Sequence, residues 1–76
     1  MEDILRTIIE NLVENHEAIS IESREEKGRE IYSVRVDSSE MGKVIGRQGK
    51  VAHSIRTIIR ALGNKEHKKI DVEFLD

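Results

Sequence analysis

The chain contains no cysteine and no proline, and its only aromatic residues are Tyr32 and Phe74. Without thiols it forms neither disulfide bonds nor thiolate metal sites. Its three histidines, His16, His53 and His67, show no metal-ligand spacing, so we expect no metal ion and no other cofactor. The serines and carboxylates form no nucleophile–base pattern. We therefore expect a protein that is not an enzyme.

Long apolar runs are also absent. No stretch approaches the roughly 20 apolar residues that span a bilayer. The acidic N-terminus, MEDILRTIIE, does not have the basic start and apolar run of a signal peptide. We expect a soluble cytoplasmic protein without a membrane partner. Its 76 residues suffice for one small domain, residues 1–76.

The formal net charge of −2 hides a strong asymmetry along the chain. Residues 1–41 carry 11 acidic and 5 basic side chains, whereas residues 42–69 carry 8 basic side chains and one acidic one. A concentrated basic segment is typical of a nucleic-acid-binding surface. Charge runs are also common on ordinary solvated faces.

Apolar periodicity predicts three helices and three strands. The helices are expected over residues 2–16, 41–45 and 51–62, the last stopped by Gly63 and Asn64. Strand-like alternation covers residues 19–22, 32–36 and 70–74, with a turn centred on Gly28. The order α-β-β-α-α-β assembles most simply as a two-layer α+β domain. The helical crossover between the second and third strands favours a parallel pair.

The stretch KVIGRQGK, residues 43–50, places two glycines between helical segments. It lacks the first glycine of a dinucleotide fingerprint and the Ser or Thr of an NTPase phosphate loop. Gly46 and Gly49 permit a sharp turn and the close approach of a ligand. The next helix begins in this turn, and its N-terminus favours anions, to which Arg47 and Lys50 add cationic donors and Gln48 a neutral one. A glycine-rich corner with solvated basic residues is the alternative.

The flanking residues resemble the signature of a KH domain. That signature has an apolar pair, Gly-x-x-Gly, a basic residue and an isoleucine further along the next helix; here these are Val44-Ile45, Gly46–Gly49, Lys50 and Ile55. The predicted element order is that of the type II KH fold, with a three-stranded mixed sheet and three helices packed on one face. The whole chain resembles the KhpA family of small bacterial proteins that consist of one KH domain.

The resemblance implies binding of single-stranded RNA. In KH domains the GxxG loop clamps the backbone of about four nucleotides. The residues that would bind RNA are Lys43, Val44, Ile45, Gly46, Arg47, Gln48, Gly49 and Lys50, with the strand of residues 32–36 as the opposite wall of the groove and Arg35 as a candidate contact. For Ile55 we expect core packing. The residues leave open whether Arg56, Arg60 and the Lys65–Lys69 cluster bind nucleic acid.

The resemblance also implies how such a domain would act. With few aromatic residues for base stacking, one domain should bind weakly and with a steep salt dependence. KhpA proteins self-associate or pair with a larger KhpB/Jag-type KH protein, so a homodimer or such a complex is expected to act as an RNA chaperone or post-transcriptional regulator. The alternative is a protein–protein adaptor that uses the KH fold mainly for dimerisation.

Overall fold

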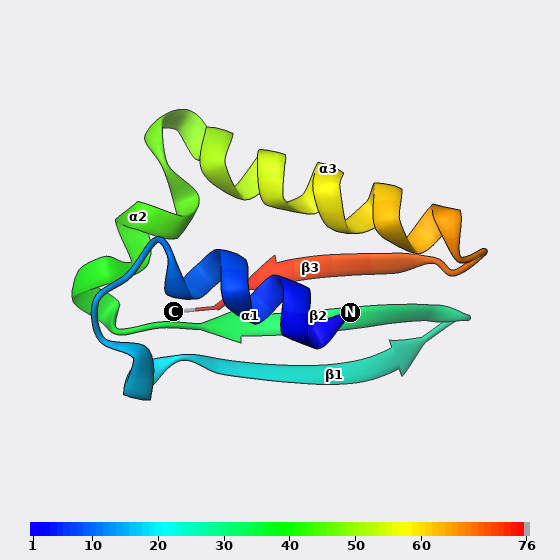
Figure 1. Ribbon diagram of the computed structural model, residues 1–76, viewed down its shortest axis with the longest axis horizontal. Helices are drawn as coiled ribbons and strands as arrows, with labels where there is room; N and C mark the ends of the chain where they lie inside the picture. The colour runs from blue at the N-terminus through cyan, green and yellow to red at the C-terminus, as the bar shows by residue number, and fades with distance from the viewer. Residues whose placement is uncertain (76) are drawn as a thin grey trace.

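Three strands form one mixed sheet with helices against one of its faces (Figure 1). The computed structural model describes residues 1–75. Its elements, in which η denotes a short 3₁₀ helix, are α1 (Glu2–Glu10), η1 (His16–Ala18), β1 (Ser20–Glu26), β2 (Arg29–Arg35), η2 (Ser38–Glu40), α2 (Met41–Ile45), η3 (Arg47–Gly49), α3 (Lys50–Lys65) and β3 (Ile70–Phe74). The two-layer α+β fold expected from the sequence is confirmed.

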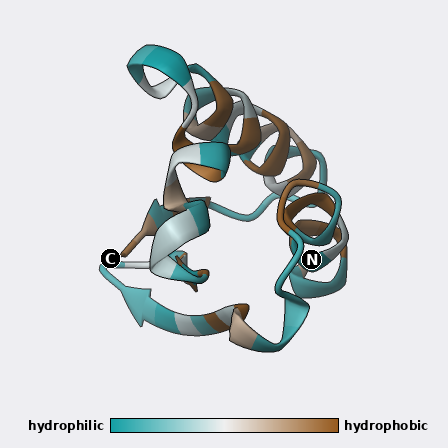
Figure 2. Ribbon diagram, turned by 90° about the vertical axis from the view of Figure 1, so that its left-hand side faces the viewer, coloured by the Kyte–Doolittle hydropathy of each residue, from teal (hydrophilic) through white to brown (hydrophobic). Residues whose placement is uncertain are grey.

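The central strand is β2, which pairs antiparallel with β1 and parallel with β3. The parallel pairing confirms the prediction from the helical crossover. Figure 2 shows α1 and α3 on the same side of the sheet, while α2 lies near the carboxyl ends of β2 and β3 in Figure 1. A short loop joins the C-terminus of α3 to the start of β3 at the end of the molecule away from α2, so the N-terminus of α3 lies at the α2 end (Figure 1).

The core lies between the sheet and the helices. Strand alternation sends one set of side chains toward the helices, where Tyr32 of β2 lies beside Val72 of β3 and Val34 beside Phe74. The helices contribute side chains at helical spacing, as the apolar stripes predicted. The largest fully buried side chains are Leu5, Ile9, Val34, Val44 and Ile59.

The first helix is shorter than predicted, and the reason is tertiary. α1 ends at Glu10, although the apolar pattern continues through the buried Val13. The backbone N–H groups of Glu14 and Asn15 donate to the carboxylate of Glu40, at 2.7 and 2.9 Å, instead of to helical carbonyls. The predicted helix over residues 2–16 was therefore wrong beyond Glu10.

The second amphipathic helix is longer than predicted, since α3 runs through Gly63 and Asn64 to Lys65. Gly63 is a buried helical residue, and a Cβ there would lie 3.0 Å from the Ile70 side chain. Its small size serves close packing and does not end the helix. The hairpin strands also extend closer to their turn than predicted. β1 continues to Glu26 and β2 begins at Arg29, because the hairpin turns tightly at Lys27 and Gly28.

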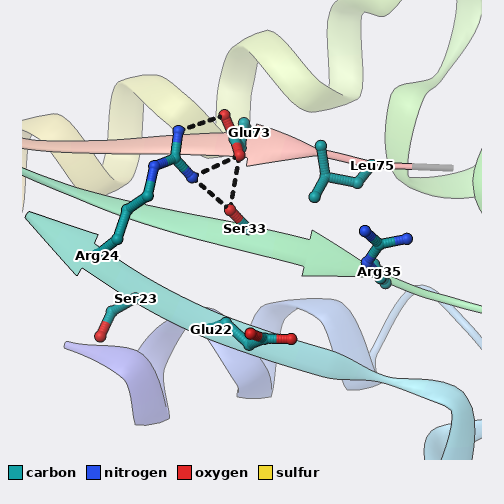
Figure 3. Close-up of a pocket in the computed structure, with 7 residues that line it drawn as sticks. All are labelled: Glu22, Ser23, Arg24, Ser33, Arg35, Glu73 and Leu75. Atoms are coloured by element: carbon teal, nitrogen blue, oxygen red, sulfur yellow. Dashed lines mark hydrogen bonds and ion pairs between the residues drawn. The ribbon is translucent and has the colours of Figure 1, made fainter. Parts of the chain in front are cut away.

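The other face of the sheet is polar and carries a hydrogen-bonded cluster (Figure 3). Arg24 of β1 donates to both carboxylate oxygens of Glu73 on β3, at 2.7 and 3.1 Å. Ser33 of β2 lies between them and donates to Glu73 at 2.6 Å. The hydrogen bonds from Arg24 and then Ser33 lower the pKa of Glu73 from 4.5 to about 2. This cluster joins all three strands.

We predict that the cost of shortening an isoleucine depends on which side of α3 it occupies. Ile59 is fully buried, whereas Ile58 is 48% exposed. Ile59→Val should lower the free energy of unfolding by about 1 kcal/mol because it leaves a small cavity, and Ile58→Val should change it by less than about 0.5 kcal/mol. Urea unfolding of both variants measures this; equal costs would contradict the packing described for α3.

We predict that Glu73 makes folding stability depend on acid pH. Its folded pKa lies below its unfolded value, so its contribution is fully present above pH 4.5 and is lost as pH falls toward 2. The stability difference between the wild type and Glu73→Gln should therefore shrink over that range. Urea unfolding from pH 2 to 6 measures it, with Glu22→Gln on the same face as the control. A constant difference would contradict the cluster.

Candidate nucleic-acid interface

The GRQG turn connects α2 to α3 at one end of the molecule (Figure 1). Gly46 has φ 76° and ψ 175°, and Gly49 has φ 76° and ψ 13°. Between them Gln48 also has a positive φ of 57°. Three positive φ values within four residues reverse the chain sharply without a longer loop.

The two glycines are required for different reasons. A Cβ at Gly46 would lie 2.8 Å from Cβ of Val51 and 2.9 Å from its backbone nitrogen, so the turn is pressed against the first turn of α3. Gly46 also occupies a backbone region that is essentially restricted to glycine. A Cβ at Gly49 would meet nothing within 4 Å. At that position only the left-handed backbone favours glycine.

The N-terminus of α3 opens into this turn. Its N-cap is Gly49, so the first N–H groups of the helix receive no side-chain cap. The helix has 16 residues and directs the positive end of its dipole toward the turn. Arg47 and Lys50 are exposed there, and neither forms an ion pair within residues 1–75. The arrangement presents backbone N–H groups and two mobile cations to an anion.

The apolar residues of the motif divide between the core and the surface. Val44 and Ile55 are 0% and 3% exposed, so both are core residues, as expected for Ile55. Ile45 and Val51 are half-buried against the same core. Of the predicted apolar contacts, Ile45 is therefore accessible to a ligand and Val44 is not.

Lys43 is held by a buried carboxylate that the sequence analysis did not single out. Glu40 is 7% exposed; its Oε2 atom accepts from Nζ of Lys43 at 3.1 Å and, with Oε1, from two backbone N–H groups. Hydrogen bonds from the N–H groups of Glu14 and Asn15 lower the pKa of Glu40 despite its burial. Because these donors lie 26 and 25 residues away in the chain, no local pattern indicates this role.

Arg35 lies away from the turn. It is exposed on the polar face of the sheet, where it lines a depression with Glu22 and Leu75 (Figure 3). β2 is the central strand, so β3 and not β2 lies beside α3 (Figure 1). The structure therefore brings residues 43–50 together and does not bring Arg35 or the predicted β2 wall to them.

The structure separates two groups among the basic residues whose role the sequence left open. Arg56 donates to the backbone oxygen of Val72 at 3.0 Å, and its guanidinium lies 5.5 Å from the Phe74 ring centroid. Arg60 donates to Asp71 at 2.9 and 3.0 Å. Both arginines thus fasten α3 to β3. Lys65 at the end of α3 and Lys68 and Lys69 in the loop that follows are exposed and form no ion pair within residues 1–75.

Two features are absent from residues 1–75. No group of histidine and acidic side chains in this part of the chain could hold a metal ion. Within the same residues, no helix is long and apolar enough to cross a membrane.

Comparisons of the sequence with known proteins find one matching family. The sequence model described as "KhpA/KhpB, KH domain" matches residues 2–74. A curated relative named RNA-binding protein KhpA from Listeria monocytogenes is 37% identical over 76 residues, and the alignment covers all of both chains. Relatives of the same name from Aquifex aeolicus and Clostridium perfringens are 36% and 38% identical; their alignments cover 100% and 99% of this chain and 96% and 100% of the relatives.

We predict that the two glycines of the turn differ in their tolerance of alanine. Gly49→Ala should cost about 1–2 kcal/mol, the price of a left-handed backbone for a residue with a Cβ. Gly46→Ala should cost more, because overlap with Val51 adds an overpacking penalty of about 1–3 kcal/mol. Urea unfolding of both variants tests this. Equal costs would show that Gly46 is not pressed against α3.

Proposed function

This chain belongs to the KhpA/KhpB KH-domain family, and we propose on that basis that it binds single-stranded RNA through the GRQG turn. The supporting observation is the turn itself, where Gly46 and Gly49 bring the backbone, the uncapped N-terminus of α3 and the exposed Arg47 and Lys50 to one place. A phosphate at this position would receive backbone N–H and cationic donors together. KH domains use this loop to clamp about four nucleotides. The relatives named as RNA-binding proteins support the same role for this chain.

The binding would depend mainly on phosphates. Tyr32 is only 6% exposed, and the half-buried Phe74 ring has the guanidinium of Arg56 5.5 Å from its centroid. Little aromatic surface is therefore available for stacking, which elsewhere contributes about 1–3 kcal/mol per base. Binding to phosphates releases counterions from the RNA, so the affinity falls as the salt concentration rises. We therefore expect a weak and strongly salt-dependent complex. Ile45, half-buried beside the turn, supplies an apolar surface under the bases.

We further propose that the domain acts in pairs, as a homodimer or with a KhpB/Jag-type KH protein. When one of two linked domains has bound the RNA, the second domain is held close to the same strand. This high effective concentration offsets the weak binding of each single domain. In this form the protein would serve in the cytoplasm as an RNA chaperone or post-transcriptional regulator. The family is one of binding domains and not of enzymes.

A protein–protein adaptor is the second candidate, and one observation favours it. Among residues 1–75, Ile4 on α1 and Ile58 on α3 are the exposed large hydrophobic side chains, at 45% and 48%, and a protein partner could cover them. Sedimentation with and without short RNA separates the two functions. An obligate dimer without RNA affinity at low salt would favour the adaptor.

We predict that Arg47→Asp combined with Gln48→Asp abolishes retention of single-stranded RNA in a gel-shift assay. The double change replaces a phosphate donor with two negative charges, while the left-handed backbone at Gln48 tolerates aspartate. The circular dichroism melt should be nearly unchanged. Arg6→Glu with Thr7→Glu on α1 gives the same charge change and should retain RNA. Unchanged binding by the first variant would reject the turn as the RNA site.

A further inference from the structure

Three basic side chains from distant parts of the sequence meet at the opposite end of α3 from the GRQG turn. Arg29 begins β2, Arg60 lies on α3, and Lys69 ends the loop before β3. Together with Asn64, Ile70 and Asp71 they line a shallow depression of about 430 Å³. We call Arg29, Arg60 and Lys69 the distal basic cluster.

The charge of this depression is positive. Among the described residues that line it, Asp71 is the only acidic one, and it accepts from Arg60 at 2.9 Å while Arg29 lies 3.7 Å away. One carboxylate thus faces three cations. The side chain of Asp71 is only 21% exposed, whereas Arg29 and Arg60 are 53% and 52% exposed. The guanidinium groups therefore retain accessible donors for a second anion.

Asp71 remains ionised and neutralises only one of the three cations. Its burial acts to raise the pKa, but hydrogen bonds from Arg60 and the Val72 backbone N–H, with the charges of Arg60 and Arg29, hold the pKa below its usual value. The neighbouring depression, which also includes Lys69, contains Glu25 and Glu30 and is more evenly balanced. The distal basic cluster is therefore the more favourable place for an anion.

The surrounding backbone fixes this cluster. The carbonyl oxygen of Lys69 accepts from the backbone N–H of Glu30 at 2.9 Å, which ties the loop to β2. Near the end of α3, the carbonyl of Gly63 accepts from the N–H groups of Glu66 and Lys68, and that of Asn64 accepts from the N–H of His67. Because these two carbonyls already accept hydrogen bonds, the C-terminus of α3 repels a nearby anion less strongly.

The cluster lies in line with the GRQG turn. Ten residues of α3 separate Lys50 from Arg60, a rise of about 15 Å. Arg56 lies between them and contacts the outer edge of β3 through the Val72 carbonyl. A strand that leaves the turn and follows the seam between α3 and β3 would reach the cluster directly.

We propose that the distal basic cluster binds a second phosphate of the same single-stranded RNA that the GRQG turn clamps. This inference rests on the proposed function. Arginine forks match phosphate geometry, and Lys69 adds a point charge to the same group. The alignment along α3 favours RNA over an acidic peptide as the occupant, because one chain of phosphates can engage both ends of the helix.

The salt dependence of RNA binding tests this proposal. Each phosphate contact on a single strand contributes about 0.7 to the slope of log K against log salt concentration. For Arg29→Gln combined with Lys69→Gln we expect the slope to fall by about 0.7–1.4 on a single-stranded RNA of about 12 nucleotides, as one or two contacts are lost. Arg6→Gln combined with Lys27→Gln makes the same charge change outside the cluster and should leave the slope unchanged. Urea unfolding confirms that both variants are folded.

The outcomes distinguish this inference from the proposed function. If the wild type binds RNA and the Arg29/Lys69 variant keeps the full slope, the distal site is overturned while RNA binding through the turn stands. An equal loss in the control variant would also overturn it, by assigning the effect to net charge. If a short polyglutamate peptide binds the wild type but not the variant while the RNA slope stays unchanged, the cluster recognises acidic protein instead. No RNA binding by the wild type would overturn the proposed function itself.

Discussion

The carboxylate of Glu40 organises the end of the molecule that carries the GRQG turn. It accepts from two backbone N–H groups after α1 and from Lys43 on α2. The same contacts end α1 and fix the start of the segment that leads to the turn. A buried carboxylate is costly to desolvate unless its lone pairs are satisfied, and here they are. The position of the turn relative to the core therefore depends on an interaction between segments about 25 residues apart.

The turn combines tight packing on one side with an open surface on the other. Gly46 is pressed against Val51, so α2 and α3 meet without space for a side chain. Gly49 faces open space and leaves the N-terminus of α3 uncapped. A rigid corner in which no side chain caps the first N–H groups of α3 is suited to a ligand that supplies an acceptor. The cost of two unusual glycine conformations is consistent with a binding role.

The fold divides the basic residues by what they already contact. Arg24, Arg56 and Arg60 join elements of the fold through Glu73, Val72 and Asp71. The exposed cations lie mainly near the two ends of α3, at the turn and in the loop before β3. A protein with a formal net charge of −2 can therefore present a local positive surface, because its acidic residues lie largely on other elements.

The sequence by itself determined the order of the elements, the parallel crossover, most of the core and the GRQG turn, because periodicity and glycine chemistry act over a few residues. It also placed Ile55 in the core. Tertiary structure decided where α1 ends, that Gly63 continues α3, that Arg35 lies away from the turn, and that Arg29 meets Arg60 and Lys69. Those outcomes depend on which distant segments the fold brings together. The Glu40 carboxylate, the packing of Gly63 against Ile70 and the strand order decide them, and none of these is visible in a local pattern.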